Sequence, residues 1–262
     1  MVSAVVVVVT VVRVEVTMNI ARTAEEAERQ AKGENIALTA AQEARLEAEA
    51  LFEINNAAAE PQNWLAHGGD QQARRYSGLD QITPDNIAGL KPAWSLDFDT
   101  TRGQESTPVV VDGVIYVTTA WSKVYAVNAK TGVKLWSFDP KVPGPSAAKN
   151  CCDVVSRGAA VYHGKVYVGT YDGRLIALDA ATGKVLWKNV IGDPGLGEGA
   201  SAAPLAWQGV VYMGIAGSEL GVRGRVMAFD AATGKELWRF NTIPMGNETG
   251  AETWTRKESA KT

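Results

Sequence analysis

Short runs of apolar, mostly β-branched residues alternate with polar turns through most of the chain after residue 60. In GAAVYHGKVYVGTYDGRLIALDA, His163-Gly164 and Asp172-Gly173 separate runs of Val, Tyr, Ile and Leu. This pattern is typical of short β-strands joined by tight turns. TPVVVDGVIYVTTAWSKVYAVNA and APLAWQGVVYMGIAGSELGVRGRVMAFDA follow the same plan, so the pattern predicts a protein built mainly of short strands.

One hairpin motif recurs three times. AVNAKTGVKLW, ALDAATGKVLW and AFDAATGKELW share the pattern A-x-[DN]-x-x-T-G-x-x-x-W and start at Ala126, Ala177 and Ala228, 51 residues apart each time. Each copy predicts a strand, a turn made by Asp or Asn with Thr-Gly, and a second strand that ends in Trp. Four short strands in about fifty residues indicate the blade of a β-propeller, whose radial repetition shields the strand edges.

The tryptophans of these repeats are expected to be structural. A Trp at the same place in each repeat predicts packing between neighbouring blades rather than chemistry. The residues concerned are Trp136, Trp187 and Trp238, with Trp94 in LKPAWSLDF expected to do the same for the preceding unit.

The first part of the chain, residues 1–58, has a different composition. The valines of MVSAVVVVVTVVRVEVT predict a strand, since the run is too short to cross a bilayer and lacks the basic start and cleavage pattern of a secretion signal. From Ala21 to Ala59, Ala and Glu dominate and predict one or two exposed helices. We therefore divide the chain into a leader of unknown role, 1–58, and propeller blades, 59–262.

Composition excludes some partners. Of the 262 residues, 46% are hydrophobic and 21% charged, which is the balance of an ordinary soluble globular protein. The net charge of -3 and the lack of a basic stripe argue against a nucleic acid partner. No membrane association is expected from this chain.

The only two cysteines, Cys151 and Cys152, are neighbours in KNCCDVVSRG. A bridge between adjacent residues closes no loop and so cannot constrain the unfolded chain. Two buried reduced thiols are one alternative. A metal site is another, although the pair lacks C-x-x-C spacing and a nearby His. The pair must serve some local chemistry.

The repeats, taken together with NWLAHG, RGQESTPVVVDGVIYV, NCCDVVSRG and GIAGSELGVRG, resemble the quinoprotein alcohol dehydrogenases, which include methanol dehydrogenase. The resemblance runs from about Ala59 to about Trp254 and implies an all-β propeller of eight blades that holds pyrroloquinoline quinone (PQQ) and a metal ion at its axis. A complete member is about twice as long, so we expect a partial propeller of about four blades after a helical leader.

The resemblance implies roles for four residues around the quinone. Cys151 and Cys152 would form a vicinal disulfide whose ring stacks on PQQ, which requires an oxidising compartment. Arg157 would bind the charged oxygens of PQQ, and Glu105 would hydrogen-bond the cofactor. Without the resemblance, Arg157 could pair with a carboxylate such as Asp153, and Glu105 could be a solvated strand end.

The resemblance also implies a metal site in GSELGVRG. Glu219 matches a family metal ligand, and its carboxylate suits Ca²⁺, with a lanthanide as the alternative. Ala216, Gly217 and Ser218 fall where family members contact PQQ, and the glycines here allow close approach of backbone to a ligand. Ser201 falls where a family Ser or Thr contacts the cofactor; a turn hydroxyl that satisfies local backbone is an equal alternative.

The implied function is oxidation of an alcohol by hydride transfer to PQQ, with electrons passed to cytochrome c or another acceptor in the periplasm. The chain has no C-x-x-C-H motif, so we expect no c-type haem attached to it. It also stops before the family positions of the catalytic base and of a second metal ligand. No catalytic residue can therefore be assigned, and we expect an incomplete or inactive fragment.

The competing hypothesis is a non-catalytic propeller that serves as a scaffold for protein partners in the cell envelope. The repeats fit both hypotheses equally. The adjacent cysteines, Arg157 and GSELGVRG favour the enzyme, because a scaffold has no physical need for them. In either case the open faces of the outermost blades predict self-association.

Overall fold

The structure is a computed structural model that describes residues 57, 59–70, 72–149, 152–217 and 220–253. The leader that we expected to contain a valine-rich strand and helices lies almost wholly outside these residues, as do Cys151, Ser218 and Glu219. Among the described residues, no helix has the length and apolar character needed to span a bilayer.

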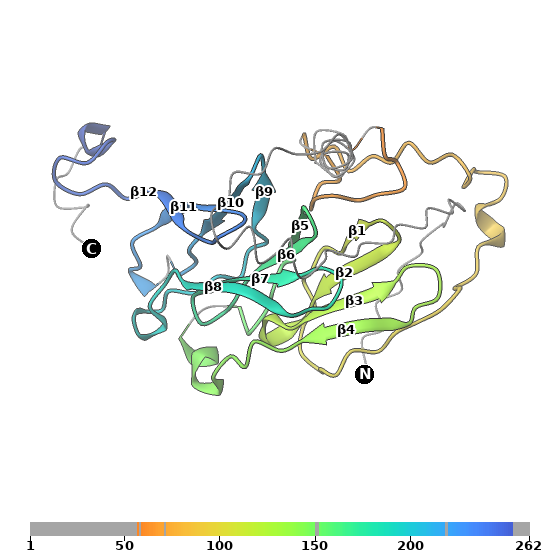
Figure 1. Cartoon of the computed structure of the whole chain (residues 1–262), viewed down its shortest axis with the longest axis horizontal. Coiled ribbons are helices and arrows are strands. Elements are labelled where there is room, and N and C mark those ends of the chain that lie inside the picture. Colours follow the sequence, from red (N-terminus) through yellow and green to blue (C-terminus); the bar gives the residue numbers. More distant parts are fainter. Residues whose placement is uncertain (1–56, 58, 71, 150–151, 218–219, 254–262) are drawn as a thin grey trace, which may run out of the picture.

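Three four-stranded antiparallel sheets form the described part of the chain, each with its strands in sequence order (Figure 1). The first contains β1 (Val109–Val111), β2 (Val114–Thr118), β3 (Val124–Asn128) and β4 (Lys134–Phe138). The second contains β5 (Ala160–Tyr162), β6 (Lys165–Gly169), β7 (Arg174–Asp179) and β8 (Val185–Val190). The third contains β9 (Leu205–Trp207), β10 (Val210–Gly214), β11 (Arg225–Asp230) and β12 (Glu236–Asn241). This architecture confirms the prediction of an all-β, partial β-propeller.

Short 3₁₀ helices supply the only helical elements among the described residues. They are η2 (Ile87–Gly89), η3 (Ala120–Ser122), η4 (Gly144–Ala148), η5 (Pro194–Leu196) and η7 (Ala251–Thr253). Two of them, η4 and η5, lie in the connections between successive sheets. The connections are therefore compact rather than extended.

The repeated hairpin motif forms the turn between the third and fourth strands of each sheet. In the second sheet the Asp179 carboxylate accepts hydrogen bonds from the Thr182 amide at 2.8 Å and from its hydroxyl at 2.7 Å. Asp230 and Thr233 repeat this arrangement in the third sheet. The strand register also shifts at the same repeat position in all three sheets, directly after the Ala that faces the Trp. The motif thus encodes both the turn and a bulge.

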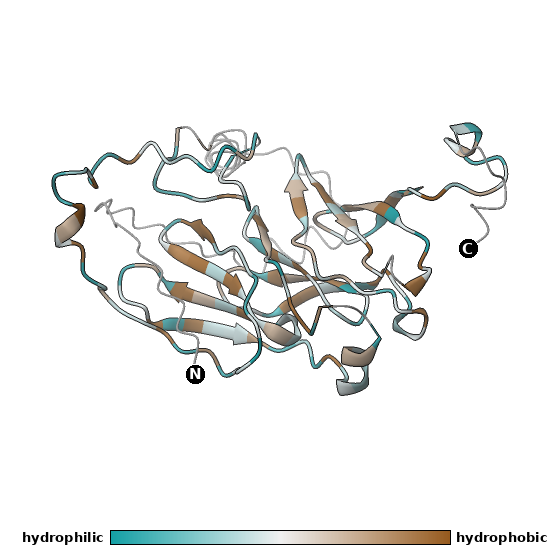
Figure 2. Ribbon diagram, turned by 180° about the vertical axis from the view of Figure 1, so that it is seen from behind, coloured by the Kyte–Doolittle hydropathy of each residue, from teal (hydrophilic) through white to brown (hydrophobic). Residues whose placement is uncertain are grey.

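Alternation along the central strands sends side chains to both faces of the middle sheet. Val166 and Val168 join a core cluster with the first sheet, whereas Tyr167 joins a cluster with the third sheet. All three side chains are completely buried. Apolar residues accordingly concentrate in the sheets while the connecting loops are more polar (Figure 2). The core is a series of layers between sheets rather than one central cluster.

Tryptophans lock each sheet to the next, as expected from the repeats. The indole Nε1–H of Trp136 donates to the Ala180 carbonyl at 2.9 Å, and Trp187 donates to the Ala231 carbonyl at 3.2 Å. Trp94 makes the same bond to Ala129 at 3.0 Å, although no strand is assigned at residues 94–98. The segment around Trp94 therefore takes the place of a further outer strand, packed on the first sheet.

The outer face of the third sheet has no such partner among the described residues. Leu237, Trp238 and Phe240 of β12 are 49%, 46% and 47% exposed. This face matches the open blade face expected from the sequence, and self-association through it stays a prediction.

Candidate functional site

The innermost strands β1, β5 and β9 lie side by side along one side of the molecule, each from a different sheet (Figure 1). The segment that leads into each strand carries one residue of the predicted site: Glu105 before β1, Arg157 before β5 and Ser201 before β9. Because neighbouring sheets place these segments next to one another, three residues that are far apart in the sequence come together.

Arg157 is the centre of this group. Its Nη2 atom forms an ion pair with Glu105 Oε2 at 3.0 Å, and its Nη1 donates to the Ser201 hydroxyl at 2.9 Å. The Arg157 and Glu105 side chains are 42% and 43% exposed, while Ser201 is buried. The guanidinium therefore has a fixed position and an open side from which an anionic or carbonyl oxygen could bind.

Backbone hydrogen bonds hold the three segments in place. The Arg157 amide donates to the Ser201 carbonyl at 2.9 Å, and the Thr107 amide donates to the Arg157 carbonyl at 3.2 Å. The site is consequently part of the interface between sheets, not a loop that projects from it. This is the kind of rigid support that precise ligand positioning requires.

Cys152, the one cysteine of the pair that the structure describes, lies in a turn of unusual conformation. Cys152 and the following Asp153 both have positive φ values, 73° and 62°, which non-glycine residues seldom adopt. Asp153 is paired with Arg102 at 2.5 Å, and the Trp121 amide donates to the Val154 carbonyl at 2.8 Å. The alternative in which Arg157 pairs with a carboxylate therefore holds for Glu105 and not for the example named, Asp153, which pairs with Arg102.

The segment before the predicted metal ligand is attached to the connection that carries Ser201. Ala216 and Gly199 form an antiparallel bridge, with the Ala216 amide donating to the Gly199 carbonyl at 2.9 Å. Gly217, with φ of 122°, packs so closely on the Gly197 carbonyl that a Cβ would clash with it. The glycine expected to allow approach of a ligand thus allows approach of the protein's own backbone. Ser218 and Glu219 lie outside the described residues, as does Cys151.

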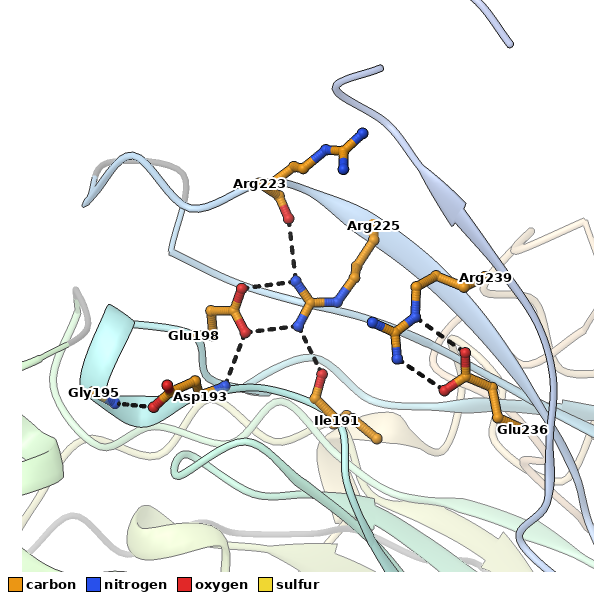
Figure 3. A network of polar contacts seen from close by, with 8 residues as sticks. All are labelled: Ile191, Asp193, Gly195, Glu198, Arg223, Arg225, Glu236 and Arg239. Atoms are coloured by element: carbon orange, nitrogen blue, oxygen red, sulfur yellow. Dashed lines mark hydrogen bonds and ion pairs between the residues drawn. The ribbon is translucent and has the colours of Figure 1, made fainter. Parts of the chain in front are cut away.

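A buried ion pair that the sequence did not indicate lies beside this segment. Glu198, three residues before Ser201, binds Arg225, the first residue of β11, through two hydrogen bonds of 2.7 Å (Figure 3). The Arg225 guanidinium lowers the pKa of the Glu198 carboxyl, against the opposite effect of burial. Position 225 lies 51 residues after Arg174, so the repeat was a signal that could have drawn attention to it.

His67 of NWLAHG was also given no role from the sequence. Its Nε2 lies 2.9 Å from an Arg75 nitrogen, and its Nδ1 lies 2.6 Å from the Thr107 hydroxyl. Because a guanidinium can only donate, Nε2 accepts, and Nδ1 of the neutral ring carries the proton. His67 therefore supports the strand segment that also carries Glu105.

A hollow of about 260 Å³ lies against the inner strands β5 and β9, and Glu105, Arg157 and Ser201 do not line it. Its walls are mostly small apolar residues of β5 and β9 and of the segments before them, with residues 65–73 on another side. Among the described residues, no group of three or more His, Cys, Asp or Glu side chains is placed to hold a metal ion.

The residues present fit a planar, anionic cofactor. The Arg157 guanidinium, the Glu105 carboxylate and the Ser201 hydroxyl lie together and supply both charged and neutral hydrogen-bonding groups. This donor set suits the carboxylates and carbonyls of a quinone.

Comparison with known proteins shows the family of this chain. Residues 64–262 match the model of the glucose/ethanol/alcohol dehydrogenase β-propeller domain family, which is designated PQQ. The dehydrogenase subunit of the quinone alcohol dehydrogenase of Gluconacetobacter polyoxogenes is 55% identical over 190 residues, which cover 70% of this chain and 26% of that protein.

Two solved structures have the same fold. The quinohemoprotein alcohol dehydrogenase ADHIIG of Pseudomonas putida HK5 superposes with a TM-score of 0.74 at 44% identity, over 80% of this chain and 31% of that one. A europium-containing methanol dehydrogenase gives 0.69 at 39% identity, over 74% and 34% of the two chains. The chain thus spans about a quarter to a third of the length of these relatives.

Proposed function

Because the chain belongs to the PQQ-dependent alcohol dehydrogenase β-propeller family, we propose that it forms part of a PQQ site used to oxidise alcohols. The observation that carries this proposal is the convergence of Glu105, Arg157 and Ser201 from three successive sheets. PQQ, when bound, would supply the chemistry by accepting the hydride equivalent of an alcohol.

Arg157 is the main cofactor contact in this proposal. Its guanidinium binds a carboxylate or carbonyl oxygen of PQQ from the open side, while Glu105 and Ser201 keep its plane oriented. The Glu105 carboxylate also accepts a hydrogen bond from the edge of PQQ. Ser201 is buried, so its main role is to hold Arg157 through its hydroxyl. The same hydroxyl also contacts PQQ.

The adjacent cysteines would form a vicinal disulfide that stacks on one face of the quinone. The positive φ values of Cys152 and Asp153 support this, because they mark a tight turn at the described cysteine, five residues before Arg157. A disulfide here requires an oxidising compartment, which supports a periplasmic location.

We propose that Glu219 binds the metal ion and that Ala216, Gly217 and Ser218 contact PQQ. The bridge from Ala216 to Gly199 supports this, because it brings the segment beside the connection that carries Ser201. Ca²⁺ is the expected metal, since a carboxylate oxygen suits a hard cation. The europium named for one structural relative keeps a lanthanide as the alternative.

The electron acceptor in this proposal is a cytochrome. One relative is named a quinohemoprotein alcohol dehydrogenase and another a 1-butanol dehydrogenase (cytochrome c), and these names support a cytochrome as the acceptor. We assign no catalytic base to this chain, and its residues serve to bind and orient the cofactor.

A PQQ titration with excess Ca²⁺, followed by tryptophan fluorescence, tests the proposal. We expect saturable quenching that weakens about tenfold or more in Arg157→Ala, because a charge-assisted contact is lost. Arg239→Ala is the matched control, since Arg239 pairs with Glu236 at 2.9 Å and is 43% exposed, like Arg157. A folded wild-type chain that binds no PQQ, or equal affinity in both variants, would contradict the proposal.

A further inference from the structure

A cation stands at the start of the third strand in every sheet. Lys123 directly precedes β3, while Arg174 and Arg225 are the first residues of β7 and β11, so all three are 51 residues apart. Each is paired with a carboxylate: Asp99 for Lys123 at 2.9 Å, Asp172 for Arg174 at 2.7 Å and Glu198 for Arg225 at 2.7 Å.

The two arginines share a second contact. Arg174 donates from Nη2 to the Pro140 carbonyl at 2.8 Å, and Arg225 donates from Nη2 to the Ile191 carbonyl at 2.8 Å. Both carbonyls lie just beyond the outer strand of the preceding sheet. The arginine at this repeat position therefore joins two neighbouring sheets.

The source of the carboxylate differs between the two copies. Asp172 lies in the turn just before Arg174, so that pair is local. Glu198 comes instead from the connection between the second and third sheets, three residues before Ser201. The Glu198 and Arg225 side chains are only 12% and 10% exposed and face each other with both oxygens and both terminal nitrogens (Figure 3).

The Glu198–Arg225 pair completes a closed series of contacts that includes Gly199 and Ala216. Glu198 is bonded in the chain to Gly199, which forms the bridge with Ala216. Ala216 follows Ile215, whose amide donates to the Arg225 carbonyl at 3.3 Å. Arg225 then returns to Glu198 through the ion pair. The local pair of Asp172 with Arg174 encloses no such segment.

We propose that Glu198 and Arg225 are positioning residues for the cofactor site, in addition to joining two sheets. The pair holds the connection that presents Ser201 to Arg157 and, through Gly199, the segment at Ala216. The expected effect on cofactor binding rests on the proposed function. The hold of the pair on the segment at Ala216 does not depend on that function. The role belongs to the third sheet only, because there the carboxylate is supplied by the connection.

The test compares Glu198→Gln with Asp172→Asn, which neutralises the equivalent carboxylate in the second sheet. Amide hydrogen exchange is first measured in the cofactor-free chain. We expect exchange of the Ala216 amide to accelerate about tenfold in Glu198→Gln and to stay unchanged in Asp172→Asn. Unchanged exchange in Glu198→Gln, or equal acceleration in both variants, overturns the proposal.

The second readout is the PQQ concentration needed for half-maximal binding in excess Ca²⁺. We expect it to rise about tenfold in Glu198→Gln and to stay unchanged in Asp172→Asn. An unchanged PQQ affinity in Glu198→Gln overturns the positioning role even if exchange accelerates. If wild-type chain binds no PQQ, the proposed function fails, and hydrogen exchange alone decides whether the pair holds the segment. Should Glu198→Gln not fold, Arg225→Lys, which keeps the charge but loses the two-pronged contact, carries both measurements.

Discussion

The indole nitrogen of Trp187 lies 3.2 Å from the carbonyl oxygen of Ala231 and donates a hydrogen bond to it across two sheets. The same carbonyl also accepts from the Tyr167 hydroxyl at 2.9 Å, and the Tyr167 and Trp187 rings are in tilted contact with centroids 5.7 Å apart. One backbone oxygen of the third sheet thus anchors two aromatic side chains of the second. The repeated Trp therefore holds neighbouring blades together.

Replacing this Trp by Phe should weaken the interface. We expect Trp187→Phe to lower the free energy of unfolding by about 1–3 kcal/mol, because a hydrogen bond and part of the buried ring are lost. Trp238→Phe is the control, since Trp238 is 46% exposed and should cost less than about 0.5 kcal/mol. Urea unfolding of both variants measures the difference, and equal costs would show that the indole bond adds nothing.

The glycine of the Thr-Gly turn should be required for a steric reason as well as a conformational one. At Gly183 the φ is 70°, and a Cβ would lie 2.6 Å from the Trp136 ring. At Gly164 the φ is 69°, but a Cβ would meet nothing within 4 Å. Both Ala variants should lose about 1 kcal/mol of unfolding free energy because of the left-handed backbone. Gly183→Ala should lose about 1–3 kcal/mol more because of the clash. Unfolding of the two variants by urea isolates that second cost; similar losses would contradict a docked Trp136.

The fold was predictable because its information is local. The alternation of short apolar runs, the Asp-Thr-Gly turn and the 51-residue period all lie within single repeats, so the blades and the docking of Trp136 and Trp187 followed from the sequence. About four blades were expected, and the described residues form three sheets; the segment around Trp94 makes the same indole bond without forming a strand.

The candidate site depends on contacts between repeats, which no local pattern reports. Glu105, Arg157 and Ser201 were named individually through the family resemblance, and only the structure shows that one guanidinium binds the other two. The reading based on proximity in sequence paired Arg157 with Asp153, but the turn at Cys152 directs Asp153 to Arg102. Glu198 was missed for the same reason, since its partner Arg225 is 27 residues away.

Metal binding should depend on Glu219. We expect Glu219→Gln to raise the Ca²⁺ concentration needed for PQQ binding by about tenfold or more, because a charged oxygen ligand is replaced by a neutral one. The unfolding free energy of the cofactor-free chain should not change. Glu252→Gln, at an exposed carboxylate on η7, is the control. Fluorescence titration of PQQ at several Ca²⁺ concentrations checks this, and an unchanged requirement in Glu219→Gln would assign the metal to other groups.

Stability should fall in acid partly through Glu198. The hydrogen bonds and charge of Arg225 lower the pKa of the Glu198 carboxyl below its usual 4.5, so the folded state binds this proton less readily than the unfolded state does. The stabilisation is therefore complete above the unfolded pKa and is lost as the pH falls through the folded pKa. Urea unfolding between about pH 6 and pH 3 should show a shallower loss of stability in Glu198→Gln than in wild type. Glu252→Gln should keep the wild-type slope, and identical slopes in all three chains would mean that the ion pair contributes nothing to acid sensitivity.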